Sequence, residues 1–136
     1  MFRPVIFVRN SNDNYNFYSS CTRERLLEDY GEHEIILSSA NSYSYSKTRV
    51  TLRHYIENMM SKPQDLKVDG ANTFYHFGDN DYESFKPLFD MYEIPFERPG
   101  TISWGLAAGS TGVPFHTHGP VFAEVIYGRK VSRILF

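Results

Sequence analysis

The hydrophobic pattern of this 136-residue chain changes near Ile102. Before that point, apolar residues recur at the three- and four-residue spacing of helices. After it, short runs of β-branched and aromatic residues alternate with glycine and proline turns, which is typical of strands. Because consecutive strands usually pair with one another, the pattern predicts an α+β fold in which a helical N-terminal half precedes an antiparallel β half.

The boundaries of the elements follow from turn and capping residues. Thr22 is suited to cap a helix that ends at Gly31, where glycine is expected to adopt the left-handed conformation. Pro87 is expected to limit or split a later helix. The predicted helices are 22–30, 52–60 and 81–92. The predicted strands are 3–8, 34–38, 72–77, 101–107, 114–118, 122–127 and 131–136. The polar stretch 10–20 is expected to be a loop.

Length and composition exclude several classes of protein. The length suits a single domain spanning 1–136. The net charge is −2 and the basic residues are scattered, so nucleic-acid binding is not predicted. No apolar run approaches the ~20 residues of a membrane-spanning helix, and the N-terminus lacks the pattern of a signal peptide. The only cysteine, Cys21, excludes an intrachain disulfide and is expected to be an ordinary thiol.

The stretch from Gly112 to Lys130 contains the residues with the clearest chemical potential. His116 and His118 are two residues apart, so in a strand both imidazoles lie on the same face and can bind one metal ion. They lie between two turns, where a strand ends at the rim of a sheet. Non-haem Fe(II) sites add a carboxylate to two histidines, whereas a site of histidines alone favours zinc, copper or nickel.

Glu124 and Lys130 each have two interpretations. Glu124 completes a metal site with the two histidines, or it pairs with Lys130 or Arg129. Lys130 binds the carboxylate of a co-substrate as a point charge, or it is a solvated surface lysine. Trp104 and Tyr127 are expected to be core aromatics rather than residues that stack on a cofactor. The separate histidines His33, His54 and His76 are expected to be core or surface residues.

Three blocks of sequence resemble the jumonji-C (JmjC) domain family. They are Arg3-Pro-Val-Ile-Phe-Val-Arg9, Thr73-Phe-Tyr-His-Phe-Gly-Asp79, and the stretch from Gly112-Val-Pro-Phe-His to Tyr127-Gly-Arg-Lys130. The resemblance implies a double-stranded β-helix of the cupin type, Fe(II) and 2-oxoglutarate as cofactors, and hydroxylation or demethylation of proteins. It also implies that His116 is the first iron ligand and that Lys130 holds 2-oxoglutarate.

This chain departs from the family pattern at two points. His118 stands where the family has Asp or Glu, and the strand and distal histidine that follow Gly-x-Lys in the family have no counterpart after Lys130. We therefore expect 1–136 to be a single, incomplete JmjC/cupin-like domain, truncated at its C-terminus, from a truncated gene product or an incomplete gene model.

The resulting functional expectation is a JmjC-domain protein without complete oxygenase activity, which acts through a protein partner. Two alternatives stay open. One is an Fe(II)/2-oxoglutarate-dependent protein hydroxylase, and the other is a cupin module that binds Fe(II) or zinc through His116, His118 and Glu124. The resemblance places a longer form in the endoplasmic reticulum lumen.

Overall fold

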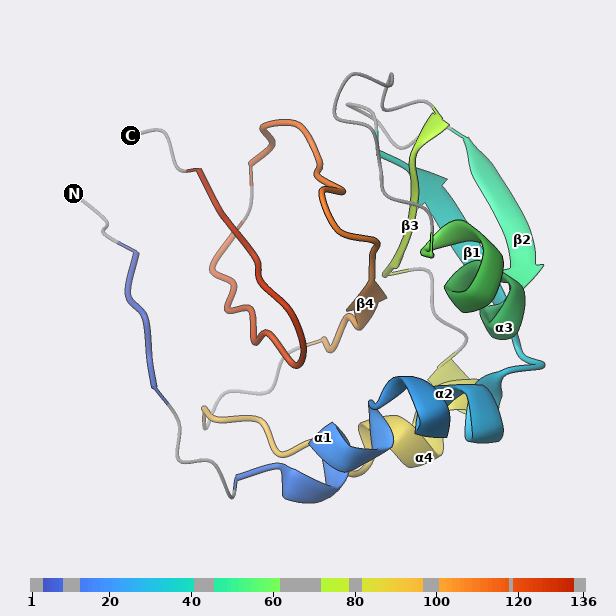
Figure 1. Cartoon of the computed structure of the whole chain (residues 1–136). Coiled ribbons are helices and arrows are strands. Elements are labelled where there is room, and N and C mark those ends of the chain that lie inside the picture. The colour runs from blue at the N-terminus through green and yellow to red at the C-terminus, as the bar shows by residue number, and fades with distance from the viewer. Residues whose placement is uncertain are drawn as a thin grey trace.

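The regular secondary structure of the described residues consists of a four-stranded antiparallel sheet and a group of short helices (Figure 1). The computed structural model describes residues 4–8, 13–40, 46–61, 72–78, 82–96, 101–117 and 119–133. The helices are α1 (Tyr15–Ser20), α2 (Arg23–Tyr30), α3 (Leu52–His54), the π-helical turn η1 (Tyr55–Met59) and α4 (Tyr82–Phe89). The strands are β1 (Glu34–Ser39), β2 (Lys47–Thr51), β3 (Phe74–Phe77) and β4 (Gly105–Leu106).

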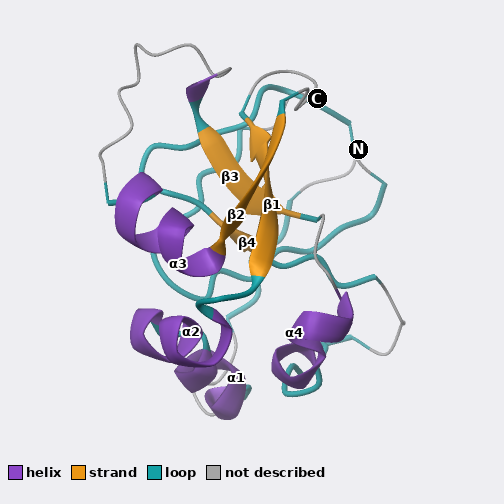
Figure 2. Cartoon of the chain, turned by 90° about the vertical axis from the view of Figure 1, so that its right-hand side faces the viewer, coloured by secondary structure: helices purple, strands orange, loops and turns teal. Residues whose placement is uncertain are grey.

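The sheet has the order β2-β1-β3-β4, with β1 as its longest strand. Ile35 pairs with Val50 of β2, and Leu37 pairs with His76 of β3. Ile35, Leu37 and His76 are buried, so one face of the sheet is part of the core. The predicted strands at 34–38 and 72–77 are confirmed, whereas β2 was not predicted. In Figure 2, α1, α2 and α4 gather at one end of the sheet and α3 lies beside it.

Helix α2 has the predicted cap but a different exit. The Thr22 side chain accepts a hydrogen bond from the Arg25 amide, which satisfies a free N–H of the first turn. Gly31 has φ −54°, so the left-handed exit is wrong. The reason for a small residue is close packing, because a Cβ at Gly31 would lie 2.3 Å from the Leu27 carbonyl oxygen and 2.7 Å from Arg53 Nη2.

Helix α1 lies within the stretch that the sequence predicts as a loop, so that prediction is wrong. Asn14 precedes the helix in the left-handed conformation (φ 61°), which asparagine tolerates better than most residues. Its buried side chain accepts a hydrogen bond from the Glu93 amide at 2.6 Å and donates one to the Glu93 carbonyl at 3.0 Å. This long-range pairing, invisible to local patterns, holds the start of α1.

Pro87 lies inside α4 without ending or splitting it, contrary to the prediction. Proline removes one backbone hydrogen bond from a helix interior. The buried side chains of Phe85, Leu88 and Phe89 offset this loss, because each is at most 4% exposed. The predicted helix 52–60 is confirmed as α3 and η1, with Thr51 as its cap.

The core joins the helices to the inner face of the sheet. Phe85 stacks on Tyr30 of α2 with ring centroids 5.0 Å apart, and it also contacts Trp104 at 5.8 Å. The Tyr55 hydroxyl lies 3.1 Å from the Phe74 carbonyl and 3.2 Å from the Leu106 carbonyl, which ties η1 to β3 and β4. We call residues 13–40, 46–61, 72–78, 82–96 and 101–108 the folded body.

The predicted antiparallel C-terminal half is wrong for the described residues. After Ile102, the only strand among them is the two-residue β4, and the sheet is built mainly from β1, β2 and β3. A run of β-branched and aromatic residues forms a strand only when its backbone is hydrogen-bonded to a neighbouring strand. Residues 4–8, 113–117 and 119–133 join no ladder of this sheet, and we call them the open segments. The parts of the predicted strands at 3, 118 and 134–136 lie outside the described residues.

The described helices include none that is long and apolar enough to cross a membrane.

Candidate functional site

The open segments carry the described residues of the predicted site. His116 and Lys130 are exposed, and Glu124 is half-buried. His118 lies outside the described residues. The structure therefore places His116, Glu124 and Lys130 within the C-terminal part of the chain that lies beyond the sheet, coloured orange to red in Figure 1.

The His116 ring is oriented by its own backbone. Its Nδ1 lies 2.8 Å from the Pro114 carbonyl oxygen. A carbonyl oxygen only accepts hydrogen bonds, so Nδ1 carries the proton in this contact. In the neutral ring the lone pair is then on Nε2, and a histidine that binds a metal through one nitrogen commonly donates from the other in this way.

Glu124 faces the helices of the folded body. Its Oε1 accepts a short hydrogen bond from the Tyr18 hydroxyl of α1, and its Oε2 accepts one of 2.5 Å from the Tyr92 hydroxyl, just after α4. Hydrogen bonds to an ionised carboxylate are shorter and stronger than those between neutral groups. We call Glu124, Tyr18 and Tyr92 the tyrosine clamp.

A third tyrosine reinforces this attachment. The Tyr127 hydroxyl donates to the Tyr18 carbonyl oxygen at 2.8 Å. Tyr127 is 60% exposed, so the prediction that it is a core aromatic is wrong. Together these contacts join the chain near Glu124 to residues more than 100 positions earlier. The sequence analysis did not identify Tyr18 and Tyr92 as partners, because nothing in their spacing links them to Glu124.

The described residues do not assemble a metal-binding group. Among them, no three His, Cys, Asp or Glu side chains converge at a position suited to a metal ion. Glu124 is directed to the two tyrosines, and His116 is the one described imidazole from the predicted pair. The described residues alone therefore do not fit an iron or zinc ion.

Trp104 contacts both Cys21 and His76 inside the core. Burial raises the pKa of the Cys21 thiol to about 12, an effect that a hydrogen bond with Trp104 partly offsets. The thiol is therefore protonated at neutral pH and unsuited to nucleophilic attack. Its interpretation as an unreactive cysteine, and that of Trp104 as a core aromatic, agree with this environment.

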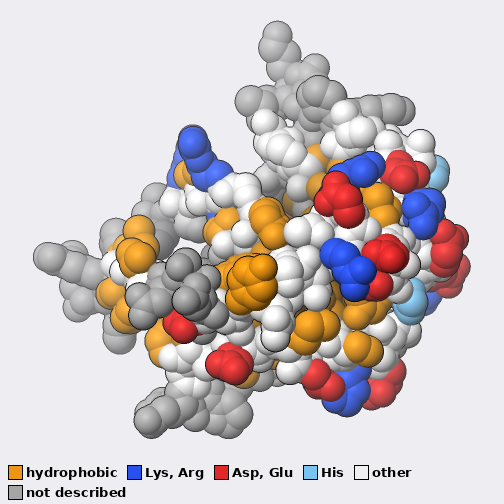
Figure 3. Space-filling model, turned by 60° about the horizontal axis from the view of Figure 1, so that its bottom comes forward, with side chains coloured by type: hydrophobic (Ala, Val, Ile, Leu, Met, Phe, Trp, Pro, Cys, Tyr) orange, Lys and Arg blue, Asp and Glu red, His pale blue; other side chains and the backbone are white. Residues whose placement is uncertain are grey.

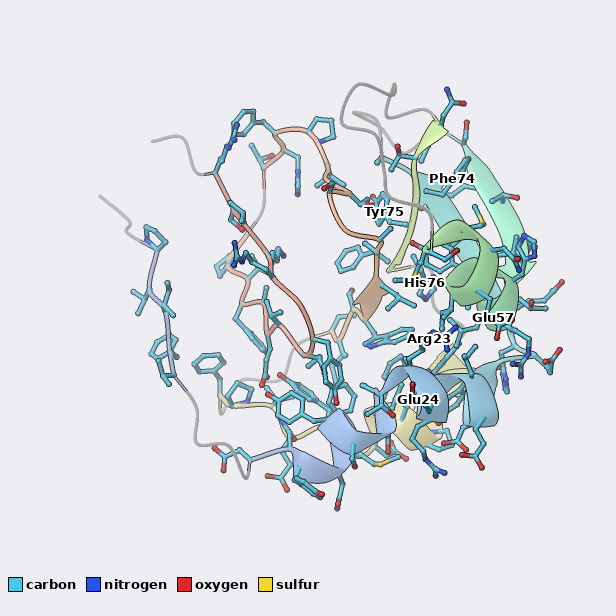
Figure 4. All side chains as sticks on the ribbon, in the orientation of Figure 1. Arg23, Glu24, Glu57, Phe74, Tyr75 and His76 are labelled. Atoms are coloured by element: carbon cyan, nitrogen blue, oxygen red, sulfur yellow. The ribbon has the colours of Figure 1, made fainter. Side chains whose placement is uncertain are left out.

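His76 lies on β3 (Figure 4). Its ring makes a T-shaped contact with the Trp104 ring, with centroids 5.6 Å apart. It is 1% exposed, and its Nδ1 lies 2.9 Å from the Ile36 carbonyl oxygen. Its Nε2 has no hydrogen-bond partner in the described structure. The prediction that His76 is a core or surface residue is confirmed, and the core is its location.

Comparison with known proteins identifies relatives along nearly the whole chain. The chain is 45% identical over 132 residues to a protein of Rattus norvegicus named JmjC domain-containing protein 8, and this match covers 94% of the chain. It is 44% identical over the same length to the proteins of that name from Mus musculus and Homo sapiens. No protein-family model and no solved structure matches the chain.

The chain is therefore a homologue of JmjC domain-containing proteins, as the sequence blocks predict. It is similar in particular to the three mammalian proteins named JmjC domain-containing protein 8. The chain spans about half the length of these curated relatives, since the matches cover 48%, 48% and 49% of them.

Proposed function

We propose that this chain acts as a JmjC-type domain through protein interaction and without oxygenase turnover of its own. The observation that carries the proposal is the exposure of apolar side chains on the open segments, such as Ile6 (91%), Phe115 (66%) and Val131 (75%). Exposed apolar surface of this extent marks interaction sites in soluble proteins.

The ligand positions support the absence of turnover. His118 replaces the carboxylate that the resemblance implies, and a metal site without an anionic ligand is less suited to Fe(II). The nearby carboxylate of Glu124 accepts two tyrosine hydroxyls and faces the helices. In this proposal residues 1–136 correspond to part of a double-stranded β-helix. A longer form of the protein resides in the endoplasmic reticulum lumen.

The test is oxygen uptake by the purified chain supplied with Fe(II) and 2-oxoglutarate. We expect the rate to equal that of the His116→Ala variant, which lacks the first predicted ligand. This substitution is at an exposed position, so it leaves the folded body intact. Uptake that depends on 2-oxoglutarate and disappears in His116→Ala would overturn the proposal in favour of the hydroxylase, in which Lys130 holds 2-oxoglutarate.

A metal-binding cupin module is the second candidate, and the orientation of His116 by the Pro114 carbonyl favours it. Calorimetric titration with zinc tests this candidate. The module predicts that His116→Ala and Glu124→Gln weaken zinc binding, whereas Lys130→Ala leaves it unchanged. Equal affinity of Glu124→Gln and the parent chain would remove Glu124 from the ligand set.

A further inference from the structure

Strand β2 is an open edge of the sheet. It pairs with β1 on one side, and no described strand lies on its other side. The Ser39 amide of β1 donates to the carbonyl of Ser46, the residue just before β2, so the backbone groups of Ser46 face β1. Such groups alternate in direction along an antiparallel strand. The N–H and C=O groups of Lys47 and Arg49 therefore point away from β1, toward the open edge.

The side chains of Lys47 and Arg49 lie on the same face of β2. Their partners across the ladder are Ser38 and Ile36 of β1, whereas Leu37, which alternates with these two, is buried in the core. Both cations are exposed, and the Lys47 ammonium donates to the Ser38 hydroxyl at 2.7 Å. The outer face of the edge strand thus presents two positive charges two residues apart.

A hollow of about 590 Å³ adjoins this edge. Its lining consists of Lys47, Thr48 and Arg49 of β2 and Ile36 of β1, with no carboxylate among these residues. The only carboxylate in the two strands is Glu34, the first residue of β1. The hollow therefore combines an aliphatic contact with positive charge and suits an acidic ligand.

Several cations elsewhere in the folded body lie against carboxylates. Lys86 Nζ is 2.6 Å from Asp90, and Arg53 Nε is 2.7 Å from Glu32. Figure 3, which brings the helices forward, shows positive and negative side chains next to one another. The Arg49 side chain differs, because it takes part in no ion pair or hydrogen bond with the described residues. Its charge is available to a partner of opposite sign.

We propose that β2 binds an extended segment of a partner protein, with acidic residues at every second position, as an additional strand of the sheet. An added strand satisfies the outward backbone groups of Lys47 and Arg49. Residues two apart on that strand share a face, so two carboxylates meet the two cations. A second copy of the chain is disfavoured here, because like charges opposite each other destabilise strand pairing. This inference rests on the proposed interaction function and names the chemistry of a partner segment.

The test is fluorescence anisotropy of a labelled octapeptide of alternating Thr and Glu, titrated with the purified 136-residue chain at low ionic strength. We expect saturable binding that Arg49→Glu weakens by about tenfold, because an attraction becomes a repulsion. Arg49 is exposed, so circular dichroism of the variant should show the parent fold.

The matched control is Arg23→Glu, which makes the same change of charge at an exposed position of α2 and should bind the peptide as the parent does. A second peptide contains N-methylated Glu, which keeps the charges but lacks the amide donors that face β2. It should bind about tenfold more weakly if the peptide adds as a strand.

Amide hydrogen exchange locates the bound peptide. Binding should slow exchange at Lys47 and Arg49, whose amides point to the open edge, because strand pairing protects them. The amides of Thr48 and Val50 face β1 and should change little.

Absence of binding, equal binding by Arg49→Glu, or equal binding of the methylated peptide would each overturn the proposal. Without binding, the role of Lys47 and Arg49 would be to keep the edge strand from unwanted pairing. These outcomes are independent of oxygen uptake. No binding and no uptake would refute the docking alone, whereas 2-oxoglutarate-dependent uptake by a chain that binds the peptide would refute the non-catalytic function alone.

Discussion

The folded body and the open segments contain the same kinds of apolar residues in opposite environments. In the folded body, Leu37, Leu52 and Leu88 are completely buried. In the open segments, Val8, Phe115 and Val131 are 94%, 66% and 75% exposed. Local composition therefore does not decide burial in this chain. An apolar run is buried only where another element lies against it, as the helices do along the inner face of the sheet.

The two regions should differ most in the free energy of unfolding that is lost when a phenylalanine is replaced by alanine. Phe85→Ala removes a ring that is 1% exposed and contacts Tyr30, Phe89 and Trp104. We expect it to lower the free energy of unfolding by about 3–5 kcal/mol. Phe115→Ala, at a ring that is 66% exposed, should change it by less than about 0.5 kcal/mol.

Urea denaturation followed by Trp104 fluorescence measures both values, since Trp104 is the only tryptophan and is buried in the folded body. Equal losses in the two variants would mean that the open segments contribute to the core as much as the folded body does.

Replacement of a glycine by alanine should also lower the stability more in the folded body than in the open segments, because the backbone is more tightly packed there. Gly31→Ala places a Cβ 2.3 Å from the Leu27 carbonyl oxygen, so α2 or Arg53 must shift, and we expect a loss of about 1–3 kcal/mol. Gly119→Ala, in an open segment, has none of the described atoms within 4 Å of its Cβ and should have little effect. Thermal melting of both variants tests this contrast, and an unchanged melting temperature in Gly31→Ala would contradict the tight packing.

Sequence predicts the elements that are specified by local residues and misses those that depend on distant contacts. Helix α2 was predictable because Thr22, Leu26 and Leu27 specify its start and its buried face locally. Helix α1 was not, because Asn14 is held by the backbone of Glu93, 79 positions away. The strands predicted after Ile102 have suitable residues, but strand formation depends on a neighbouring strand that local sequence does not specify.

The candidate site shows the same limit of prediction. The sequence predicted that Glu124 binds a metal or pairs with Lys130 or Arg129, and family resemblance gave roles to His116 and Lys130. The two carboxylate oxygens of Glu124 instead accept hydrogen bonds from the hydroxyl groups of Tyr18 and Tyr92. These two tyrosines come from distant elements. Such a contact depends on the packing of α1 and α4, so spacing within 112–130 contains no sign of it.

The smallest effect should come from the tyrosine clamp, which joins the two regions. Glu124→Gln keeps the size of the side chain but replaces one carboxylate oxygen with an NH₂ group, which cannot accept a hydrogen bond from a tyrosine hydroxyl. Because Glu124 is half-buried and the core is untouched, we expect a loss of only about 1 kcal/mol in global stability. Amide exchange at residues 121–127 should nevertheless become faster, while exchange in β1 stays slow.

The matched variant is Tyr92→Phe, which removes one hydroxyl donor and leaves the charge on Glu124. If the clamp attaches the C-terminal part of the chain, this variant should increase exchange at the same residues, and the double variant should add less than the sum of the two single changes. Additive effects would mean that Glu124 and Tyr92 act independently. Non-additive effects confined to residues 121–127 would show that the carboxylate serves to fasten an open segment to the folded body, which is a structural role for Glu124 distinct from metal binding.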